Sequence, residues 1–235
     1  MWLSASLPQV TVPVGFDPQQ GACLQEGWFL GKCLGAGMQG CVFALTNGAG
    51  PDAHPIGRVY KQVNNRVVAT AAGALTGLER EWVIGQQLNA ALCAPDGFLP
   101  GFMQVGAAVI DHEGRFVGLV LEQLHGKEVA DRLSDPGFAD VEYVLECLRQ
   151  VLTALAAADV ALGFRHRDMR IENIMEHVED GKQGGGGQLS ALPPGFGPRV
   201  PLEGRVFKVG RCDVAGGGGG EVLFLPRVVV EGLLG

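Results

Sequence analysis

The sequence predicts an α+β fold in which a small β-rich lobe precedes an incomplete helical lobe. Three observations support this fold class. Short β-like runs punctuated by glycine fill residues 28–63, a helical spacing of apolar residues follows in 66–92, and a longer helical pattern covers 140–162. The chain therefore reads as strands, one helix, further strands and one long helix, and no internal repeat interrupts this order.

The first lobe is expected to contain five strands and one helix. Residues 1–26 hold three prolines and show little periodicity, which indicates an extended arm. The strand candidates that follow are 28–34, 40–46, 56–63, 102–110 and 115–124. Within 66–92, Leu78, Trp82 and Leu88 are spaced for one helical face. These elements predict a five-stranded antiparallel sheet with a helix at about residues 70–91.

The second lobe begins with a long helix, predicted over about residues 140–161. Its apolar residues at helical spacing form one stripe that we expect to be buried: Val141, Val144, Leu145, Leu148, Leu152, Leu155 and Ala156. A polar loop covers 165–173. Beyond Met175 the pattern decays into glycine- and proline-rich sequence, with a single strand candidate at 205–209 and an apolar tail at 221–234.

Composition excludes several functional classes. The chain has 235 residues, 47% of them hydrophobic, and a net charge of −7, which argues against a nucleic-acid partner. The longest mostly apolar stretch, 151–164, is shorter than the roughly 20 residues that a membrane span needs. The N-terminus lacks the basic region of a signal peptide, and the six cysteines form no Cys-x-x-Cys pair. We therefore expect an intracellular, cytoplasmic location and reduced thiols.

A glycine-rich motif lies between the first two strand candidates. It reads Gly35-Ala36-Gly37-Met38-Gln39-Gly40-Cys41-Val42, and glycines at such positions let backbone N–H groups approach phosphate oxygens. By itself the motif is equally compatible with an ordinary hairpin turn. A dinucleotide-binding glycine motif would open a helix, whereas β-like sequence follows here.

A lysine and a glutamate follow the glycine motif along the chain. Lys61 ends a strand candidate, where a solvated edge charge is the simplest interpretation, but its ammonium could also pair with phosphate oxygens. A lysine with that role needs a carboxylate to hold it. Glu81 fits this role better than Glu79, because apolar residues follow Glu81 on its own helical face. We therefore predict that Lys61 and Glu81 lie close together.

The string His166-Arg167-Asp168-Met169-Arg170-Ile171-Glu172-Asn173 resembles the catalytic loop of the protein kinase family, H-R-D-x-x-x-x-N. All its fixed positions match, and it follows a long helix, as that family requires. The glycine motif, the strand lysine and the helix glutamate precede it in the family's order. The resemblance covers roughly residues 28–176 and implies a kinase-like fold and the use of ATP and Mg²⁺.

The resemblance also implies roles for individual residues. Asp168 would be the catalytic base, Asn173 a Mg²⁺ ligand, and Arg170 the cation that neutralises the transferred phosphoryl group. Lys61, held by Glu81, would pair with phosphate. The remaining nucleotide contacts would be made by residues of the glycine motif, the strands above the adenine, the hinge and the strand below: Gly35, Gly37, Gly40, Val42, Val59, Glu122, Leu124, Glu128 and Met175. ATP would then sit between the glycine motif and Met175.

The same resemblance divides the chain into segments. An N-terminal arm (1–27) would precede the N-lobe (28–121), a hinge (122–127) and a partial C-lobe (128–215). A glycine- and proline-rich insertion at about 178–205 would interrupt the C-lobe, and a low-complexity and apolar tail (216–235) would follow it.

Two departures from the family pattern leave the activity open. The metal-binding Asp should lie two residues beyond Val209. Either Asp213, which lies four residues beyond Val209, is a shifted version of it, or the residues Ile-Asp-Phe are missing between Val209 and Gly210 and the chain lacks this Asp. Gly85 stands where a large apolar residue of the helix is usual, which predicts unfilled volume. The first interpretation is an ATP-dependent protein kinase acting on a protein hydroxyl, with Ser/Thr favoured although Arg170 replaces the usual lysine. The alternatives are a nucleotide-binding or scaffolding pseudokinase and a truncated product.

Overall fold

A computed structural model describes residues 8–37, 40–62, 77–95, 99–178, 202 and 205–209. The chain divides into two compact units. The N-terminal unit comprises Met1–Gln86 and Met103–Leu124, and the C-terminal unit comprises Gln87–Phe102 and His125–Gly235. Among the described residues, no helix is long and apolar enough to cross a membrane.

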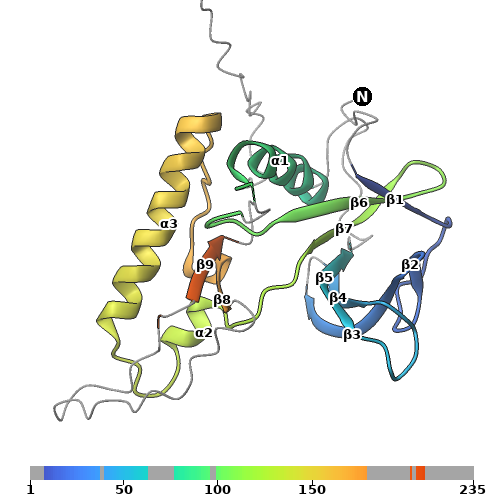
Figure 1. Cartoon of the computed structure of the whole chain (residues 1–235), viewed down its shortest axis with the longest axis horizontal. Helices are drawn as coiled ribbons and strands as arrows, with labels where there is room; N and C mark the ends of the chain where they lie inside the picture. The colour runs from blue at the N-terminus through green and yellow to red at the C-terminus, as the bar shows by residue number, and fades with distance from the viewer. Residues whose placement is uncertain are drawn as a thin grey trace, which may run out of the picture. The chain divides into compact units, whose positions relative to one another are not determined.

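The N-terminal unit is built on a seven-stranded sheet in the order β1-β6-β7-β5-β4-β3-β2 (Figure 1). The strands are β1 (Gln9–Val12), β2 (Cys23–Gln25), β3 (Trp28–Gly37), β4 (Gly40–Thr46), β5 (Pro55–Gln62), β6 (Val105–Asp111) and β7 (Phe116–Glu122). The five predicted strands are β3 to β7, and they pair antiparallel. The prediction of five strands was wrong in number, because two further strands join the sheet.

Both additional strands come from the segment predicted to be an arm. β1 pairs parallel with β6, placing Val10 beside Val109, and β2 pairs antiparallel with β3. Residues of β1 alternate between exposed and buried, as in a half-buried strand. The run is only four residues long and lies between two prolines, so this two-residue period is hard to recognise in the sequence. Residues 9–12 and 23–25 of the expected arm therefore belong to the sheet.

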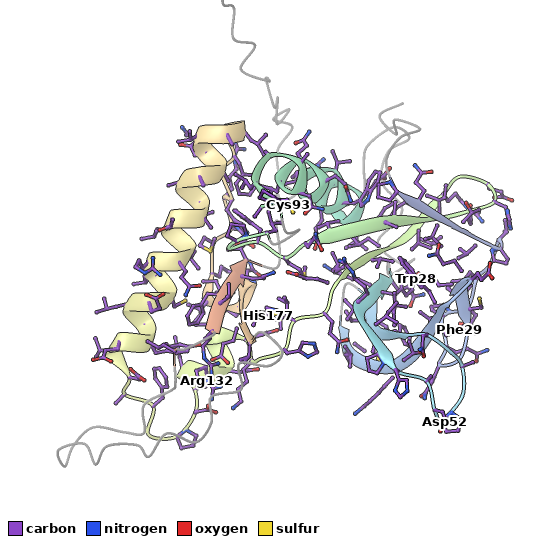
Figure 2. All side chains as sticks on the ribbon, viewed as in Figure 1. Trp28, Phe29, Asp52, Cys93, Arg132 and His177 are labelled. Atoms are coloured by element: carbon purple, nitrogen blue, oxygen red, sulfur yellow. The ribbon has the colours of Figure 1, made fainter. Side chains whose placement is uncertain are left out.

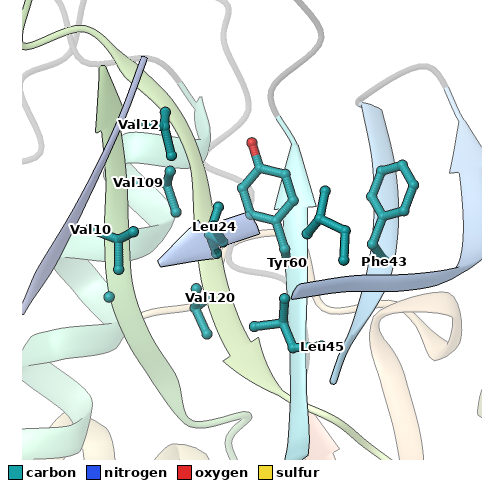
Figure 3. Close-up of a cluster of buried hydrophobic side chains, with 10 residues drawn as sticks. Val10, Val12, Leu24, Phe43, Leu45, Tyr60, Val109 and Val120 are labelled. Atoms are coloured by element: carbon teal, nitrogen blue, oxygen red, sulfur yellow. The ribbon is translucent and has the colours of Figure 1, made fainter. Parts of the chain in front are cut away.

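Two apolar clusters stabilise the N-terminal unit, and Figure 3 shows the first of them. It gathers Val10, Val12, Leu24, Leu45 and Tyr60 with their neighbours, and the Tyr60 hydroxyl donates a hydrogen bond to the Val117 carbonyl at 3.1 Å. Burial raises the pKa of Tyr60. Val120 of β7 also belongs to this first cluster. Because successive strand residues point to opposite faces, the apolar residues beside Tyr60 and Val120 in these strands face the other way and belong to a second cluster.

The second cluster packs the helix α1 (Gly77–Leu92) against the sheet. Trp82 is fully buried among Val59, Leu119 and Leu121, and its indole N–H donates to the Gly106 carbonyl at 3.2 Å. The helix lies within the predicted 66–92. Residues 66–76 of that prediction lie outside the described residues.

Gly85 brings α1 close to β6 and leaves no empty space. A Cβ atom at this position would lie 2.2 Å from Cγ2 of Val105, so the valine occupies the volume of the absent side chain. The expectation of unfilled volume at Gly85 was therefore wrong. A residue from a neighbouring strand supplies the apolar contact, which sequence order could not show.

The described part of the C-terminal unit from His125 onward contains three helical segments and a pair of antiparallel strands. They are α2 (Val129–Leu133), α3 (Val141–Leu162), the 3₁₀ turn η2 (Ile171–Asn173), β8 (Ile174–Val178) and β9 (Arg205–Val209). Asp140 caps α3 by accepting a hydrogen bond from the Tyr143 backbone N–H at 3.0 Å, and Gly163 ends it with φ 64°. The strand predicted at 205–209 is present, and β8 was not anticipated.

The long helix buries a different face from the one predicted. Its buried residues are Tyr143, Cys147, Val151, Ala154 and Ala158, whereas Val141, Leu145, Leu148 and Leu152 of the predicted stripe are exposed. Both sets recur at helical spacing, so periodicity alone could not choose between them. At Ala154 the inner side holds a small residue because the backbone of another segment approaches closely: a Cβ at Gly101 would lie 2.1 Å from Cβ of Ala154.

A buried carboxylate links the elements of this unit. The side chain of Glu176, on β8, is 1% exposed. It accepts hydrogen bonds from Arg132 of α2 (labelled in Figure 2) at 2.8 and 3.1 Å, from the Tyr143 hydroxyl at 2.7 Å, and from Arg205 of β9. Burial alone would raise the pKa of this carboxyl, but the bonds from Arg132 and Tyr143 outweigh burial and the pKa lies below its ordinary value.

We expect Gly85→Ala to destabilise the N-terminal unit although alanine favours helices. Overpacking against Val105 should lower the free energy of unfolding by about 1–3 kcal/mol. Chemical denaturation measures this change. Gly77→Ala is the matched control, because a Cβ there meets open space. A stabilisation of about 1 kcal/mol by Gly85→Ala, as helix propensity alone predicts, would contradict the close approach.

We expect Glu176→Gln to lower the free energy of unfolding by about 3 kcal/mol near pH 7, because Arg132 and Arg205 lose their buried counter-charge. The folded-state pKa lies below the ordinary 4.5, so the wild-type advantage is complete above that pH. It is lost as the pH falls through the folded-state pKa. Denaturation at several pH values measures both effects.

Glu146→Gln provides the matched control for Glu176→Gln. Hydrogen bonds from Arg149 and Gln150 lower the pKa of Glu146 to about 2. Its partner Arg149 is largely exposed, so its loss should cost less than about 1 kcal/mol. Equal losses in the two variants would refute the central role of Glu176.

Candidate functional site

The glycine motif forms the end of the β3–β4 hairpin. Gly37 pairs with Gly40, and strand structure continues on both sides, with residues 38 and 39 outside the described residues. Gly40 has φ 133°, a conformation that favours glycine. A Cβ at Gly35 would meet nothing within 4 Å. The motif thus leaves backbone open at the tip of a hairpin, and it does not open a helix.

Lys61 and Glu81 form the ion pair that the sequence predicts. The Lys61 Nζ lies 2.8 Å from Oε2 and 3.2 Å from Oε1 of Glu81, so the ammonium faces both carboxylate oxygens. Their side chains are 14% and 6% exposed. The pair joins β5 to α1 inside the N-terminal unit and limits the rotation of the lysine side chain.

Val42 and Val59 lie on the same face of the sheet as Lys61. Val42 is directly opposite Lys61 across β4 and β5, and Val59 precedes Lys61 by two residues. Leu119 and Leu121 continue this face on β7, opposite Lys61 and Val59. Lys61, Val42 and Val59, which the sequence singles out, therefore place one cation beside apolar side chains on one face of the sheet.

Glu122 is the last residue of β7, and Leu124 follows the strand at the end of the N-terminal unit. The Glu122 side chain accepts a hydrogen bond from the Gln104 backbone N–H at 3.0 Å, and its own backbone N–H donates to the Gln104 carbonyl at 3.0 Å. Gln123 donates its backbone N–H to the Gly57 carbonyl at 2.9 Å. These bonds fix the backbone that leads to Leu124, the last residue of this unit.

Glu128 and Met175 are neighbours in the C-terminal unit. They form an isolated antiparallel bridge, and Glu128 immediately precedes α2 in an extended conformation. The segment before Glu128 lies against β8, where a Cβ at Gly126 would come within 2.5 Å of the Glu176 carbonyl oxygen. The structure thus brings together two residues predicted to contact the nucleotide.

The loop 165–173 brings Asp168 and Asn173 together. The Asn173 side-chain N–H₂ donates to the Asp168 carbonyl at 2.9 Å and lies 3.4 Å from Asp168 Oδ2. Because this amide nitrogen faces Asp168, the amide oxygen is the atom with which Asn173 can ligate a cation. Arg170 lies beside them, with Nε 3.8 Å from Asp168 Oδ1.

This loop contains one residue with a strained backbone and is held by aromatic packing. Arg167 has φ 59°, and it is the only non-glycine residue in the described part of the chain with positive φ. Such conformations are uncommon and concentrate at functional sites. The buried His166 ring packs edge-on against Phe164, which packs in the same way against Phe102. The loop is therefore anchored from its N-terminal side.

The proposed metal site includes one described residue, Asn173. Asp213, the other predicted ligand, lies outside the described residues. Among the residues that the structure does describe, no group of three or more His, Cys, Asp or Glu side chains is placed to hold a metal ion.

Sequence reasoning missed the residues that support the site. Gln104 fixes the backbone before Leu124, and Glu176 holds β8 beside Gly126 and Glu128. A glutamate in the apolar run Ile174-Met175-Glu176 was a usable signal, because a buried carboxylate requires partners. No local pattern marks Gln104.

Comparison with known proteins gives matches at the level of structure. No protein-family model matches the sequence, and no curated protein matches it. Two crystal structures of the Mycobacterium tuberculosis PknI kinase domain, a single and a double mutant, each match with a TM-score of 0.52 and 16% identity. The first match covers 85% of this chain and 64% of that chain, and the second covers 86% and 66%.

The chain thus spans somewhat less than two thirds of the length of the first matched kinase domain. At 16% identity the comparison shows the fold alone. The α+β class and the β-rich N-terminal unit are consistent with it. The chain therefore has a protein-kinase-like fold.

Proposed function

We propose that the chain is an ATP-dependent protein kinase that transfers a phosphoryl group to a protein hydroxyl, with Ser/Thr proteins as the favoured substrates. The ion pair between Lys61 and Glu81 is the observation that carries this proposal. A lysine held by a carboxylate in a largely buried position is oriented in advance to bind an anion such as the phosphate chain of ATP. The protein-kinase-like fold supports the same assignment.

The N-terminal unit would bind the nucleotide. The backbone N–H groups of Gly35, Gly37 and Gly40 would approach the phosphates, since no side chain blocks them. The apolar surface formed by Val42 and Val59 would cover the adenine ring.

The backbone that follows β7 would read the edge of the adenine ring. The Glu122 carbonyl would accept a hydrogen bond from the base, and the Leu124 N–H would donate one. The Gln104 hydrogen bonds position this backbone before the base arrives.

The C-terminal unit would perform the transfer. The substrate hydroxyl oxygen attacks the γ-phosphorus, the bond to the ADP oxygen breaks, and the hydroxyl proton goes to the Asp168 carboxylate. Arg170 would neutralise charge on the transferred group, as its position beside Asp168 allows. Glu128 would hold the ribose and Met175 the lower face of the adenine.

Asn173 would hold Mg²⁺ through its amide oxygen, with Asp213 as the second ligand. When bound, the ion offsets the negative charge of the phosphates. The amide nitrogen of Asn173 remains engaged with Asp168, which would keep the base and the metal ligand in one arrangement.

A second candidate is a pseudokinase that binds nucleotide or serves as a scaffold for a protein partner. The position of Asp213 favours this candidate, because it lies four residues beyond Val209 rather than two. A displacement of 1 Å in a reacting group can lower a rate about 100-fold. ATP binding and turnover are therefore tested separately.

We expect Lys61→Ala to weaken the binding of a non-hydrolysable ATP analogue by about tenfold or more, because a charge-assisted bond to phosphate is lost. Isothermal titration calorimetry measures the affinity. Lys32→Ala is the control, since Lys32 is exposed on β3 of the same unit. Equal, tight binding by the wild type and Lys61→Ala would rule out the phosphate role of this lysine.

We expect the 235-residue chain to phosphorylate protein substrates very weakly or not at all, because Asp213 is displaced from the family position. Transfer from radiolabelled ATP with and without Mg²⁺ measures this activity. Asp168→Asn should abolish any transfer that is present, whereas Asp159→Asn, on the exposed side of α3, should not.

Robust Mg²⁺-dependent transfer that Asp168→Asn abolishes would overturn the expectation of weak turnover and exclude the pseudokinase. If Asp213→Asn also abolished that transfer, Asp213 would be identified as the metal ligand in a shifted position. ATP binding without any transfer would favour the pseudokinase.

A further inference from the structure

The long helix α3 presents an unpartnered apolar stripe. Val141, Leu145, Leu148 and Leu152 are 64%, 60%, 49% and 61% exposed. Their spacing of four, three and four residues places them on one face of the helix. Contiguous exposed apolar side chains of this size are characteristic of a surface that another segment covers.

The opposite side of α3 is already covered by the unit's own elements. Gln150 accepts a hydrogen bond from the Phe207 backbone N–H at 2.9 Å and donates to the Arg205 carbonyl at 3.2 Å, so β9 runs alongside the helix. In Figure 1, α2, β8 and β9 lie on the same side of α3. The stripe faces away from these elements, and the chain leaves β9 at Val209 beside the helix.

The sequence beyond Val209 contains a second apolar segment. Residues 221–234 include nine large apolar side chains: Val222, Leu223, Phe224, Leu225, Val228, Val229, Val230, Leu233 and Leu234. Residues 210–220, with five consecutive glycines at 216–220, connect this tail to β9.

The connection is long enough to reach the stripe. A glycine-rich segment of this length has a root-mean-square end-to-end distance of about 18 Å, and a helix is about 10–12 Å across with its side chains. From Val141 to Leu152 the stripe is about 17 Å long, and fourteen residues exceed that length even as a helix. The tail can therefore cover the stripe without displacing β9.

We propose that residues 221–234 pack against the exposed stripe of α3. The stripe and the tail belong to one chain, so the effective concentration of the tail near the stripe is on the order of millimolar. A second copy of the chain at micromolar concentration has no such advantage and loses translational and rotational freedom on association. The tail is thus favoured over self-association through α3, and this contact does not depend on nucleotide binding.

A photo-crosslinking residue at position 148 of the full-length chain tests the proposal. After irradiation and trypsin digestion, we expect crosslinks to peptides 212–227 and 228–235, which cleavage after Arg211 and Arg227 releases. The crosslinked protein should migrate as a monomer. In an equal mixture of ¹⁴N- and ¹⁵N-labelled chains, the two partners of each crosslink should carry the same label.

The control places the same probe at Thr153, an exposed residue of α3 outside the stripe, where crosslinks to the tail should be at least about tenfold fewer. The double variant Leu223→Asp and Val229→Asp should reduce crosslinking from position 148 by about tenfold, because carboxylates are costly to bury without partners. Circular dichroism should be unchanged in that variant.

Three outcomes would overturn the proposal. Crosslinks between chains of different label would show that a second copy covers the stripe. Crosslinks to other peptides of the same chain, or no crosslink above that of the Thr153 control, would show that the tail does not cover it.

Discussion

The carboxylate of Glu176 meets donors from α2, α3 and β9, three elements that are separated along the chain by up to 73 residues. In water each of these groups would be solvated, and inside the unit each requires the others to offset the loss of solvent. Removing the Glu176 carboxylate would take one shared acceptor from Arg132, Tyr143 and Arg205 together. The hairpin of β8 and β9 therefore stays closed although 26 residues separate its strands. Asn173 and Met175 lie within three residues of this glutamate, so the contacts that hold Glu176 also restrict where these two residues lie.

Most of the fold and of the candidate site could be predicted where local patterns have one interpretation. The five strands around the glycine motif and the limits of α3 follow from periodicity, and the pairing of Lys61 with Glu81 follows from order and helical face. The predictions failed where two different structures are compatible with the same local sequence pattern. α3 carries apolar residues on two faces, and contacts with residues far away along the chain, such as Gly101 beside Ala154 and Phe207 beside Tyr143, decide which face is buried. Val105 fills the space at Gly85 from 20 residues away, which no helical pattern encodes.

The residues predicted to carry the chemistry fall in both units, and each unit holds its own residues by different contacts. In the N-terminal unit, an ion pair and strand pairing orient the cation and the apolar surface. In the C-terminal unit, a strained residue at Arg167 and the bond between Asn173 and Asp168 shape the loop. Each group of residues is organised by contacts within its own unit. A substitution that disturbs one group therefore need not disturb the other, which is why the proposed nucleotide binding and the proposed phosphoryl transfer call for separate tests.

The parallel pairing of β1 with β6 has a consequence for how the chain is made. Val10 lies beside Val109, so the first strand has no partner until about a hundred further residues have been synthesised. Contacts between such distant segments slow folding, and an unpaired apolar strand favours aggregation until its partner strand is available. A ribosome that pauses before β6 would leave Val10 and Val12 exposed in the nascent chain. The sheet of the N-terminal unit can therefore be completed only after residues 105–111 have been synthesised.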